Sequence, residues 1–485
     1  MTPHVVQARI QNPRYVPRVT IAMLPDVALL EIFDFCLHYH DIWGLNPLRY
    51  PKWYTLVHVC RKWRNIVFGS PARLDLQLYC TARSPVMTSL DVWPSSLPIV
   101  IHMNNARRAP DMDNVIAALK QNDRICRLSL SVSEPSSWEK AFATMQLPFP
   151  ALTSISLTNG HEIAPVDADS FLGGSAPPHL QLIWFVGIPI PGLPKLLLSA
   201  THLVRLDYWG IPHSGYVSPE AMVTCLSVLT RLEKLTIGFK SPQSRPDRRH
   251  PPPRTRTILP VLTFLSLTGV SEFLEDFVAR IDAPLLDKLE ITFFHQLLFD
   301  TPQLVLFISR TPKLKTHDKL EARVLFPFWS ETNVSFKAHD ERLHFRILCK
   351  KSDWQLSSLA QVCSSSFPQA LISTVEHLYI SEYPSGNRDY NIDDIESCQW
   401  LELLRPFTAI KHLYITPKST PGIATALQCL TAETVTEVLP ALQTFFLETL
   451  PSKHIQEAIE KFAAARQLFN RPITVSRYER GVSNY

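Results

Sequence analysis

Glycine is scarce in this sequence, and the glycine-rich motifs of many enzymes are missing. Only 14 of the 485 residues are glycine, whereas 40 are proline, so proline must form many of the turns. The sequence contains no G-x-x-x-x-G-K-[ST] phosphate-binding loop, no G-x-G-x-x-G, no G-x-S-x-G and no H-E-x-x-H. We therefore expect that this chain is not an enzyme and that it has no catalytic residue, cofactor or metal site.

Paired cysteines are also missing. The nine cysteines are scattered and none forms a C-x-x-C pair, which argues against a zinc ribbon or a redox dithiol. Their number is odd and no secretory signal peptide precedes them, so we expect reduced thiols. The sequence therefore predicts a cytoplasmic or nuclear location, or both.

No apolar run is suited to crossing a membrane. The longest, residues 180–200, contains Pro189, Pro191 and Pro194, and so many prolines break a membrane-spanning helix. We interpret this run as a buried strand followed by an irregular return, and we expect no membrane partner.

Excess charge of one sign is confined to one short segment. The formal net charge is +4, and residues 240–256 carry six basic residues, one acid and five prolines. The rest of the chain is near neutral, so we expect no nucleic-acid partner. The prolines favour disorder, and we assign a flexible basic loop to residues 240–257. This loop could recognise a phosphorylated protein, act as a nuclear-localisation patch, or be a solvated insertion.

The strongest positive signal is a repeat. The pattern L-x-x-L-x-L, with any apolar residue at the three fixed places, recurs about every 28 residues. Each copy predicts one short strand whose fixed residues point inward, and neighbouring strands must stack into a curved parallel sheet to bury them. The copies are Ile125-Leu128-Leu130, Leu152-Ile155-Leu157, Leu180-Ile183-Phe185, Leu203-Leu206-Tyr208, Leu232-Leu235-Ile237, Leu262-Leu265-Leu267, Leu286-Leu289-Ile291, Val375-Leu378-Ile380, Ile410-Leu413-Ile415 and Leu442-Phe445-Leu447.

This pattern resembles an irregular leucine-rich repeat without the asparagine of regular repeats. The resemblance implies an α/β fold, a solenoid in the form of a horseshoe whose parallel sheet lines the concave face. We expect helical returns at 111–123 and 271–283, and a helix around 455–462 followed by an extended segment, 473–478, at the far end. Between residues 315 and 374 the pattern lapses, and we expect the sheet to continue there with atypical units of uncertain register.

The first of two amphipathic segments near the start begins with Leu24-Pro25, and proline suits the first turn of a helix. Apolar residues then follow at the spacing of one helical face, with Phe35 beside that stripe, so the apolar arc is wide. One part of the arc can pack inside a module, and the remainder needs another partner. The residues of the stripe are Leu29, Ile32, Phe33, Cys36 and Leu37.

The second segment, residues 56–64, reads LVHVCRKWR and predicts another short helix. Val59 and Trp63 share its apolar face, and basic residues occupy the other face. Pro71 marks its end, because the residue before a proline is pushed out of the helical region.

These two segments resemble the F-box, whose pattern opens with Leu-Pro, continues with Leu, Ile and Phe, and closes with Val-Cys-Arg-x-Trp-Arg. The resemblance covers about residues 22–75, with Val27 where the family usually has glutamate and a long connection at 40–53. It implies a three-helix module that docks on the Skp-type adaptor of SCF ubiquitin ligases and, through the adaptor, on cullin. The adaptor-binding residues so implied are Leu24, Pro25, Leu29, Ile32, Phe33, Val59 and Trp63.

The two resemblances together imply a domain organisation and a function. Residues 1–20 would be a disordered tail, 21–75 an F-box domain, and 76–485 a leucine-rich-repeat domain, as in a large group of fungal F-box proteins. Such a chain is expected to be the substrate-recognition subunit of an SCF-type cullin-RING ubiquitin ligase, with an unknown protein as its substrate. Two alternatives stay open: a repeat scaffold without a ligase role, and a simple helical cap at 24–67.

A substrate would bind on the concave face. The residues between the fixed positions of each strand point to that side, and aromatic and arginine side chains anchor most protein interfaces. Alternatively, these side chains pack against their neighbours within the sheet. The candidate substrate-binding residues are Trp184, Arg205, Trp209, Tyr379, Tyr414 and Phe446.

Overall fold

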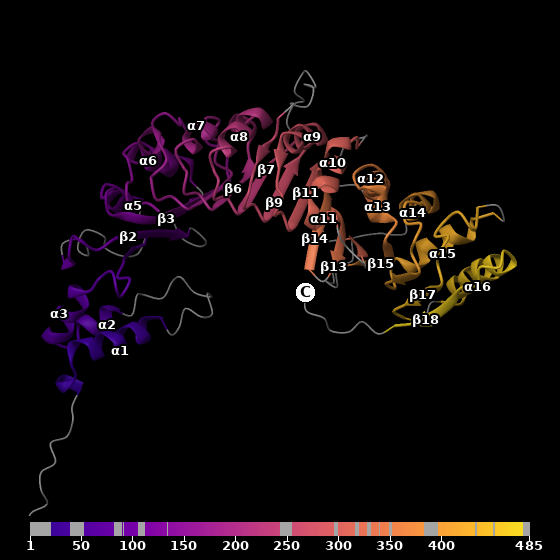
Figure 1. The fold of residues 1–485 in the computed structure, drawn as a ribbon, viewed down its shortest axis with the longest axis horizontal. Coiled ribbons are helices and arrows are strands. Elements are labelled where there is room, and N and C mark those ends of the chain that lie inside the picture. Colours follow the sequence, from indigo (N-terminus) through magenta and orange to yellow (C-terminus); the bar gives the residue numbers. More distant parts are fainter. Residues whose placement is uncertain are drawn as a thin grey trace, which may run out of the picture. The chain divides into compact units, whose positions relative to one another are not determined.

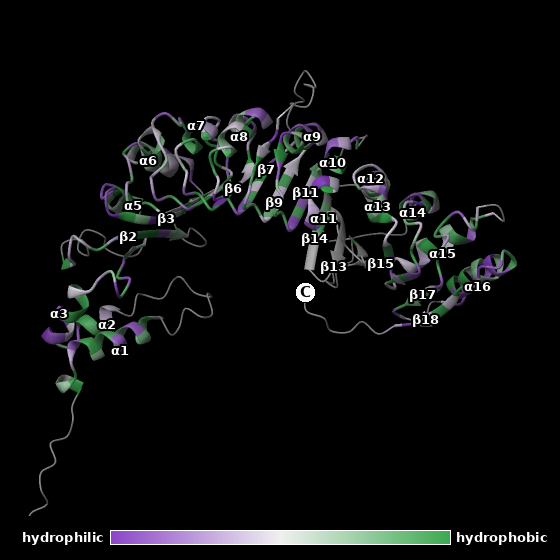
Figure 2. Cartoon of the chain, viewed as in Figure 1, coloured by the Kyte–Doolittle hydropathy of each residue, from purple (hydrophilic) through white to green (hydrophobic). Residues whose placement is uncertain are grey.

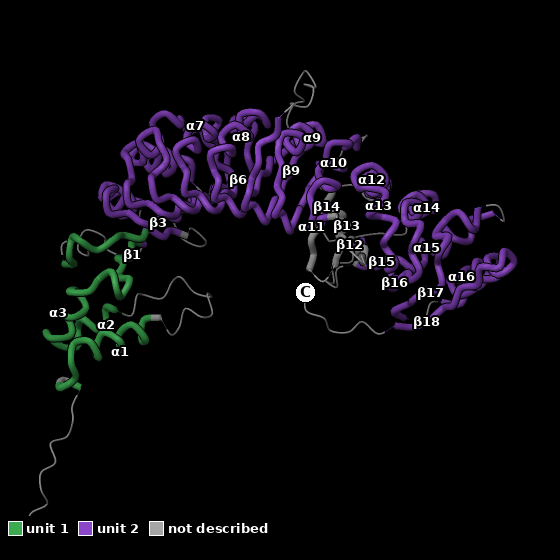
Figure 3. The backbone as a smooth tube through the Cα atoms, viewed as in Figure 1, with its two compact units in different colours: residues 1–80, 87–100 green, residues 81–86, 101–485 purple. Residues whose placement is uncertain are grey.

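The computed structural model divides the chain into two compact units (Figures 1 and 3). Unit 1 comprises residues 1–80 and 87–100, and unit 2 comprises residues 81–86 and 101–485. Unit 1 extends beyond the boundary expected at residue 75, because Trp93 packs on the helical module, with its ring centroid 5.2 Å from that of Trp53. The structure describes residues 21–38, 53–81, 90, 92–104, 112–132, 134–242, 255–294, 299–315, 320–326, 331–338, 340–348, 352–382, 396–431, 434–449 and 452–478.

Unit 1 is a small helical module (Figure 1). The single helix expected over its second segment is wrong, because the chain bends between Val57 and Arg61, with Cys60 fully extended (φ −160°, ψ 169°). The bend turns Val57 into the interior and leaves Val59 58% exposed. The predicted tail 1–20 and most of the long connection lie outside the described residues. The elements of unit 1 are η1 (Ile21–Met23), α1 (Asp26–His38), α2 (Trp53–Val57), α3 (Arg61–Gly69) and β1 (Leu78–Cys80).

The interior of unit 1 is apolar and aromatic. Leu29, Phe33 and Val57 are fully buried, and Trp53 is 2% exposed. The one polar atom of the Trp53 side chain is satisfied, since its Nε1–H donates to the carbonyl of Gln77 at 3.1 Å. Burying a large apolar side chain contributes about 1.5–3 kcal/mol, so these residues hold the module together.

Unit 2 contains one long sheet, whose strands in spatial order are β3, β4, β5, β6, β7, β9, β11, β14, β13, β12, β15, β16, β17 and β18. Most neighbours are parallel, as expected. The bounds are β2 (Ile99–Asn104, which the unit boundary crosses), β3 (Ile125–Val132), β4 (Ser154–Asn159), β5 (Leu182–Val186), β6 (Arg205–Ile211), β7 (Lys234–Phe239), β9 (Phe264–Gly269), β11 (Lys288–Phe294), β12 (Leu320–Phe326), β13 (Glu331–Ala338), β14 (Asp340–Leu348), β15 (Val375–Glu382), β16 (His412–Ile415), β17 (Thr444–Leu447) and β18 (Thr474–Arg477).

The ten copies of the repeated pattern fall on ten of these strands, and their fixed residues lie in register. Leu128 pairs with Ile155, which pairs with Ile183, and the same alignment continues from β5 to β11. These fixed residues are buried, whereas most of the residues between them are partly exposed. Hydrophobic and hydrophilic residues accordingly alternate along the strands (Figure 2). The sheet thus buries one face and leaves the other open, and we call the latter the open face.

The lapse in the pattern is an antiparallel insertion. The sheet continues there, as expected, but β13 runs antiparallel to both β14 and β12, so a purely parallel sheet is a wrong prediction for this part. The outer strands of the insertion restore the parallel order, β14 beside β11 and β12 beside β15. The physical reason is the spacing, since β12 and β13 are separated by only four residues and a parallel crossover needs a dozen or more.

The helices of unit 2 lie on one side of the sheet (Figure 1). The returns expected at 111–123 and 271–283 are confirmed as α5 (Met112–Leu119) and α9 (Ser271–Ala279), although Ile281 leaves the helix for the short strand β10 (Ile281–Asp282). The run 180–200 contains β5, as expected, and its return includes one turn of helix, α7 (Leu193–Leu197). The other helices are α6 (Pro135–Thr144), α8 (Pro219–Leu226), α10 (Pro302–Arg310), α11 (Pro312–Lys315), α12 (Ser352–Ser365), α13 (Gln369–Ile372), α14 (Ser397–Leu404), α15 (Thr420–Gln428) and α16 (Lys453–Leu468), with 3-10 turns η3 (Phe171–Gly174) and η4 (His213–Gly215).

The far end of unit 2 is formed by α16 and β18, as expected, and β18 pairs with β17. The basic loop is shorter than expected at its end. Residues 243–254 lie outside the described residues, but Thr257 belongs to strand β8 (Thr257–Ile258), which pairs with β10. Arg256, one of the six basic residues, is held by an ion pair with Asp282 at 3.9 Å. Within the described part of the chain, no helix combines the length and apolar character needed to cross a membrane.

Candidate functional site

Unit 1 exposes several large apolar side chains on its helices. Ile32 is 39% exposed, Phe35 64% and Val59 58%. Ile32 and Phe35 lie three residues apart on α1, and Val59 lies in the bend between α2 and α3. We refer to these three exposed residues together as the unit 1 apolar surface. Scattered apolar residues are normal on a protein surface, and Ile21, Met23, Val27 and Val92 are also exposed among the described residues of unit 1. Seven large exposed apolar side chains on so small a module are typical of a docking site.

Other residues expected to contact the adaptor lie inside the module. Leu29 and Phe33 are fully buried, and Trp63 is half-buried with its ring centroid 4.7 Å from that of Phe33. Leu29 and Phe33 therefore offer no surface to a partner, which corrects their assignment as contact residues. Their place follows from the helical period, because positions i and i+4 share the inward face of α1. Leu29 and Phe33 belong to the core of the module, against which α1, the helix that carries Ile32 and Phe35, packs.

Leu24 and Pro25 set the start of α1. Leu24 is half-buried and Pro25 is exposed, and the carbonyl of Pro25 accepts the first helical bond from the N–H of Leu29 at 3.0 Å. Lys62 of α3 secures this end, since its Nζ donates to the carbonyl of Leu24 at 3.0 Å and lies 3.4 Å from Asp26 Oδ1. Pro25 thus begins the helix, as its sequence position suggests, and the carbonyl of Leu24 anchors this end to α3 through Lys62.

Three of the substrate-binding candidates form a stacked aromatic ladder on the open face of unit 2. Tyr379 of β15 pairs with Tyr414 of β16, which pairs with Phe446 of β17. The ring centroids of Tyr379 and Tyr414 are 4.2 Å apart with an interplanar angle of 9°, and those of Tyr414 and Phe446 are 4.5 Å apart at 4°. All three rings are half-buried, so they pack sideways on one another and still present an apolar surface.

Polar groups and one further ring complete the ladder. His377 and His412 lie beside it with ring centroids 4.7 Å apart and ring planes tilted by 34°, and the hydroxyl of Tyr414 lies 3.4 Å from Nδ1 of His377. Tyr478, just beyond β18, meets Tyr414 edge-on at 5.4 Å. Tyr478 is absent from the sequence-based candidates, although it follows a segment that alternates as a strand.

The other candidates gather on β5 and β6. The guanidinium of Arg205 lies 5.2 Å from the ring centroid of Trp184 and forms an ion pair with Asp207, which is almost buried. Trp209 lies two residues beyond Asp207 on the same strand, where it pairs with Val186 rather than with Trp184. Trp184 is 38% exposed and Trp209 52% exposed, so both indoles are accessible on the open face.

The two aromatic clusters do not form one pocket. Between β6 and β15 the sheet contains β7, β9, β11, β14, β13 and β12, which amounts to seven strand spacings. At about 4.8 Å per spacing the clusters lie roughly 34 Å apart along the sheet. A single ligand that touches both must therefore span about the length of ten extended residues, and either cluster alone suits a shorter peptide segment.

Metal-ligand geometry is not seen at these surfaces. Among the residues that the structure describes, no group of three or more His, Cys, Asp or Glu side chains is placed to hold a metal ion. Comparison of the sequence with protein-family models and with curated proteins found no match to either. The fold and the two surfaces are thus the observations from which a function is inferred.

Proposed function

We propose that this protein is the substrate-recognition subunit of an SCF-type ubiquitin ligase, with unit 1 acting as an F-box and unit 2 as a leucine-rich-repeat domain. The observation that carries the proposal is the unit 1 apolar surface. The module's interior is already filled by Leu29, Phe33 and Trp53, yet Ile32, Phe35 and Val59 stay exposed. Exposed apolar area that the module's own core does not cover can pack against a partner, here the Skp-type adaptor, which in turn binds cullin.

The open face of unit 2 would hold the target protein. The ladder of Tyr379, Tyr414 and Phe446 offers preorganised rings, and Trp184 with Arg205 offers a second anchor far along the sheet. Aromatic and arginine side chains contribute on the order of 2 kcal/mol or more each when they anchor an interface. Two separated anchors favour an extended protein partner over a small molecule.

The mechanism is one of proximity. Unit 1 fixes the chain to the ligase, and unit 2 keeps the target near the ubiquitin-conjugating enzyme. Tethering raises the effective concentration of the target's lysines to the millimolar range for a short, flexible link, so ubiquitin transfer needs no catalytic group from this chain. Ubiquitin transfer to the target would take place in the cytoplasm or the nucleus.

The proposal is tested by the ubiquitin-modified proteins in cells that express three versions of the chain. One is native, one carries Ile32→Glu with Val59→Glu, and one carries Tyr379→Ala, Tyr414→Ala and Phe446→Ala. We expect a set of proteins whose ubiquitin-modified peptides increase with the native chain and with neither variant, as counted by mass spectrometry. A Tyr379→Phe, Tyr414→Phe variant keeps the stacked rings and should behave as the native chain does.

A different outcome distinguishes a ubiquitin-ligase subunit from a repeat scaffold without a ligase role. If the native chain captures proteins through the open face while no ubiquitin-modified peptide changes in abundance, the chain is a scaffold without a ligase role. Unchanged ubiquitin modification in all versions, including the native one, would contradict the proposal.

A further inference from the structure

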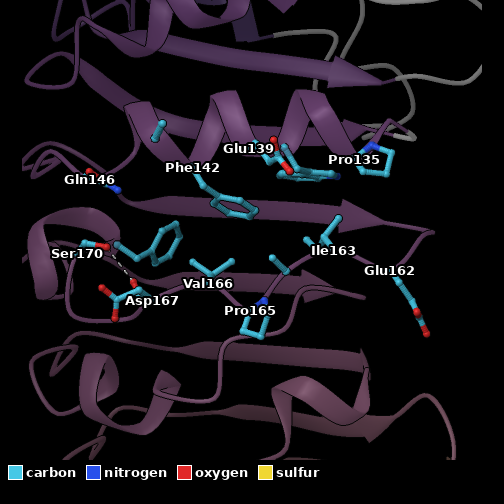
Figure 4. A pocket seen from close by; sticks show the side chains of 14 residues that line it. Pro135, Glu139, Phe142, Gln146, Glu162, Ile163, Pro165, Val166, Asp167 and Ser170 are labelled. Atoms are coloured by element: carbon cyan, nitrogen blue, oxygen red, sulfur yellow. Dashed lines mark hydrogen bonds between the residues drawn. The ribbon is translucent and has the colours of Figure 1, made fainter.

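A groove on unit 2 lies apart from the open-face residues, between α6 and the loop 162–170 that follows β4. Its volume is about 500 Å³, which is within the range of sites that hold small ligands or a few side chains. Phe142 projects from α6 into this space, and Ile163 and Val166 line it from the facing loop (Figure 4). The groove therefore has two apolar walls.

The wall on α6 is fixed by aromatic packing. Phe142 stacks on Trp138 with centroids 5.2 Å apart and meets the edge of Phe171 at 6.0 Å. Trp138 is itself anchored, since its Nε1–H donates to the carbonyl of Val132 at 3.2 Å. Phe142 is only half-buried, so part of its ring is presented to the groove in a set orientation. A ligand need not order this wall when it binds.

The rim of the groove is acidic. Glu139, Glu162 and Asp167 line it and are exposed, and the lining includes no lysine, arginine or histidine. Glu162 and Asp167 lie at opposite sides of the view, with Val166 between them (Figure 4). The nearest lysine along the loop side, Lys195, is paired with Asp169 and not with a residue of the rim.

A hydrogen bond within the loop fixes the orientation of the Asp167 carboxylate at the rim. Oδ1 of Asp167 accepts the N–H of Asp169 at 3.1 Å, and the Asp167 carbonyl accepts the hydroxyl of Ser170 at 3.3 Å. These two bonds join residues of the loop to one another and fix its local shape. On α6, Lys140 is exposed next to Glu139 but does not line the groove. The groove thus combines an apolar interior with three negative charges at its edge.

We propose that this groove binds a short segment of a partner protein in which an arginine or lysine stands beside a large apolar residue. The apolar side chain packs between Phe142 and Val166, and the cation pairs with one carboxylate of the acidic rim while the other two add to the negative charge around it. Charge complementarity of this kind selects the partner, because an acidic or phosphorylated segment is repelled by the same rim. The inference does not rest on the ligase function, since it concerns neither unit 1 nor the open face.

The test uses a random heptapeptide library displayed on phage and the full chain as bait. The groove variant carries Glu139→Gln, Glu162→Gln and Asp167→Asn, which keep the shape and one oxygen of each side chain, replace the other oxygen by NH2 and remove three charges. The matched control carries Glu220→Gln, Glu233→Gln and Glu437→Gln, which remove the same charge at exposed positions on other elements. The thermal unfolding of all three proteins is compared first, so that a folding defect is not mistaken for lost binding.

The native chain and the control should enrich heptapeptides with arginine or lysine next to Leu, Ile, Phe or Met. The groove variant should lose that enrichment. The best enriched peptide, synthesised with a fluorescent label, should bind the groove variant about fivefold more weakly by anisotropy, because a partly exposed ion pair and the negative charge around it are lost. Its affinity for the native chain should fall with rising salt.

Three results overturn the inference. One is the absence of any enriched basic peptide with the native chain. Another is the same loss of binding in the control as in the groove variant, which would indicate only a general effect of net charge. The third is self-association of the native chain that the groove variant lacks in sedimentation, because a second copy would then occupy the groove.

Discussion

The indole of Trp209 lies over Gly238 on the neighbouring strand β7, where a Cβ atom at Gly238 would be 2.2 Å from Cδ1 of Trp209. Any other residue at 238 must therefore displace the indole. This relationship explains why one of the exposed anchors of the open face can lie across the next strand. It also turns a glycine, one of only 14 in the chain, into a residue that shapes the candidate surface.

A Gly238→Ala substitution should move Trp209 without unfolding unit 2. We expect a loss of about 1–3 kcal/mol in the free energy of unfolding, since the added methyl group overfills a packed site. The movement is measured by 19F NMR of 5-fluorotryptophan protein, with the Trp209 resonance assigned from a Trp209→Phe variant. A Trp209 resonance that stays in place would show that the indole does not depend on Gly238.

The guanidinium of Arg466 is buried at the far end of unit 2, where its hydrogen-bond partners within the described part of the chain are backbone carbonyls and not a carboxylate. The side chain is fully buried, and its Nη atoms donate to the carbonyls of Val435, Val438, Leu439, Pro440 and Leu442 at 3.2–3.5 Å. Burial lowers the pKa of Arg466, chiefly by desolvation. The Leu439 carbonyl also accepts the N–H of Leu442, and the Pro440 carbonyl also accepts from Arg471. The guanidinium of Arg466 thus supplies donors to the carbonyls of Val435, Val438 and Leu442.

Replacing Arg466 by Met keeps much of its apolar stem and removes the donors. We expect the C-terminal segment of unit 2, α16 and β18, to lose about 2–4 kcal/mol of local stability, because buried carbonyls are left without donors. Hydrogen exchange by mass spectrometry should show faster exchange in α16 and β18 and little change in β3 to β7. Uniform acceleration throughout unit 2 would contradict this local role.

Cysteine reactivity should follow burial and local charge. Burial raises the pKa of the Cys225 thiol to about 12 from an ordinary value of 9.0. The pKa of Cys398, which is exposed, is raised mainly because its thiol donates to Glu396 at 3.4 Å. Only the thiolate reacts, so at pH 8 alkylation should be fastest at an exposed thiol such as Cys429, slower at Cys398 and slowest at Cys225.

One variant and one pH dependence check the direction of these pKa shifts. Glu396→Gln should speed alkylation of Cys398 and leave Cys429 unchanged, as measured by mass spectrometry of iodoacetamide adducts. The native state should also lose stability as pH rises above about 9, because the thiol of Cys225 ionises in the unfolded chain before it does in the folded one. Equal alkylation rates at Cys225 and Cys429 would contradict the buried position.

Much of the fold is encoded locally. The ten strands of the repeated pattern are predictable because a single alternating set of apolar residues decides both the strand and its inward face. The antiparallel insertion was not predicted, since period-two alternation does not specify strand direction. The short spacing between Phe326 and Glu331 was the available signal, because so few residues cannot form a parallel crossover.

The sites were harder to predict than the fold. The helical pattern assigns Leu29, Ile32 and Phe33 to the same apolar face. Only the packing of α2 and α3 against α1 decides that Ile32 stays exposed. The bend that exposes Val59 has no proline or glycine to mark it. The aromatic ladder was predictable as a set, because its residues occupy equivalent repeat positions, whereas the place of Trp209 depends on a glycine in the next strand.

The most direct test of the central claim is co-purification of the full chain with a Skp-type adaptor. The native chain is compared with the Ile32→Glu, Val59→Glu variant and with Val92→Glu, which alters another exposed valine of unit 1 (64% exposed). Circular dichroism checks that all three are folded. We predict that the native chain and Val92→Glu retain the adaptor and that the double variant loses it. Failure of the native chain to retain the adaptor, or retention by all three proteins, would contradict the account.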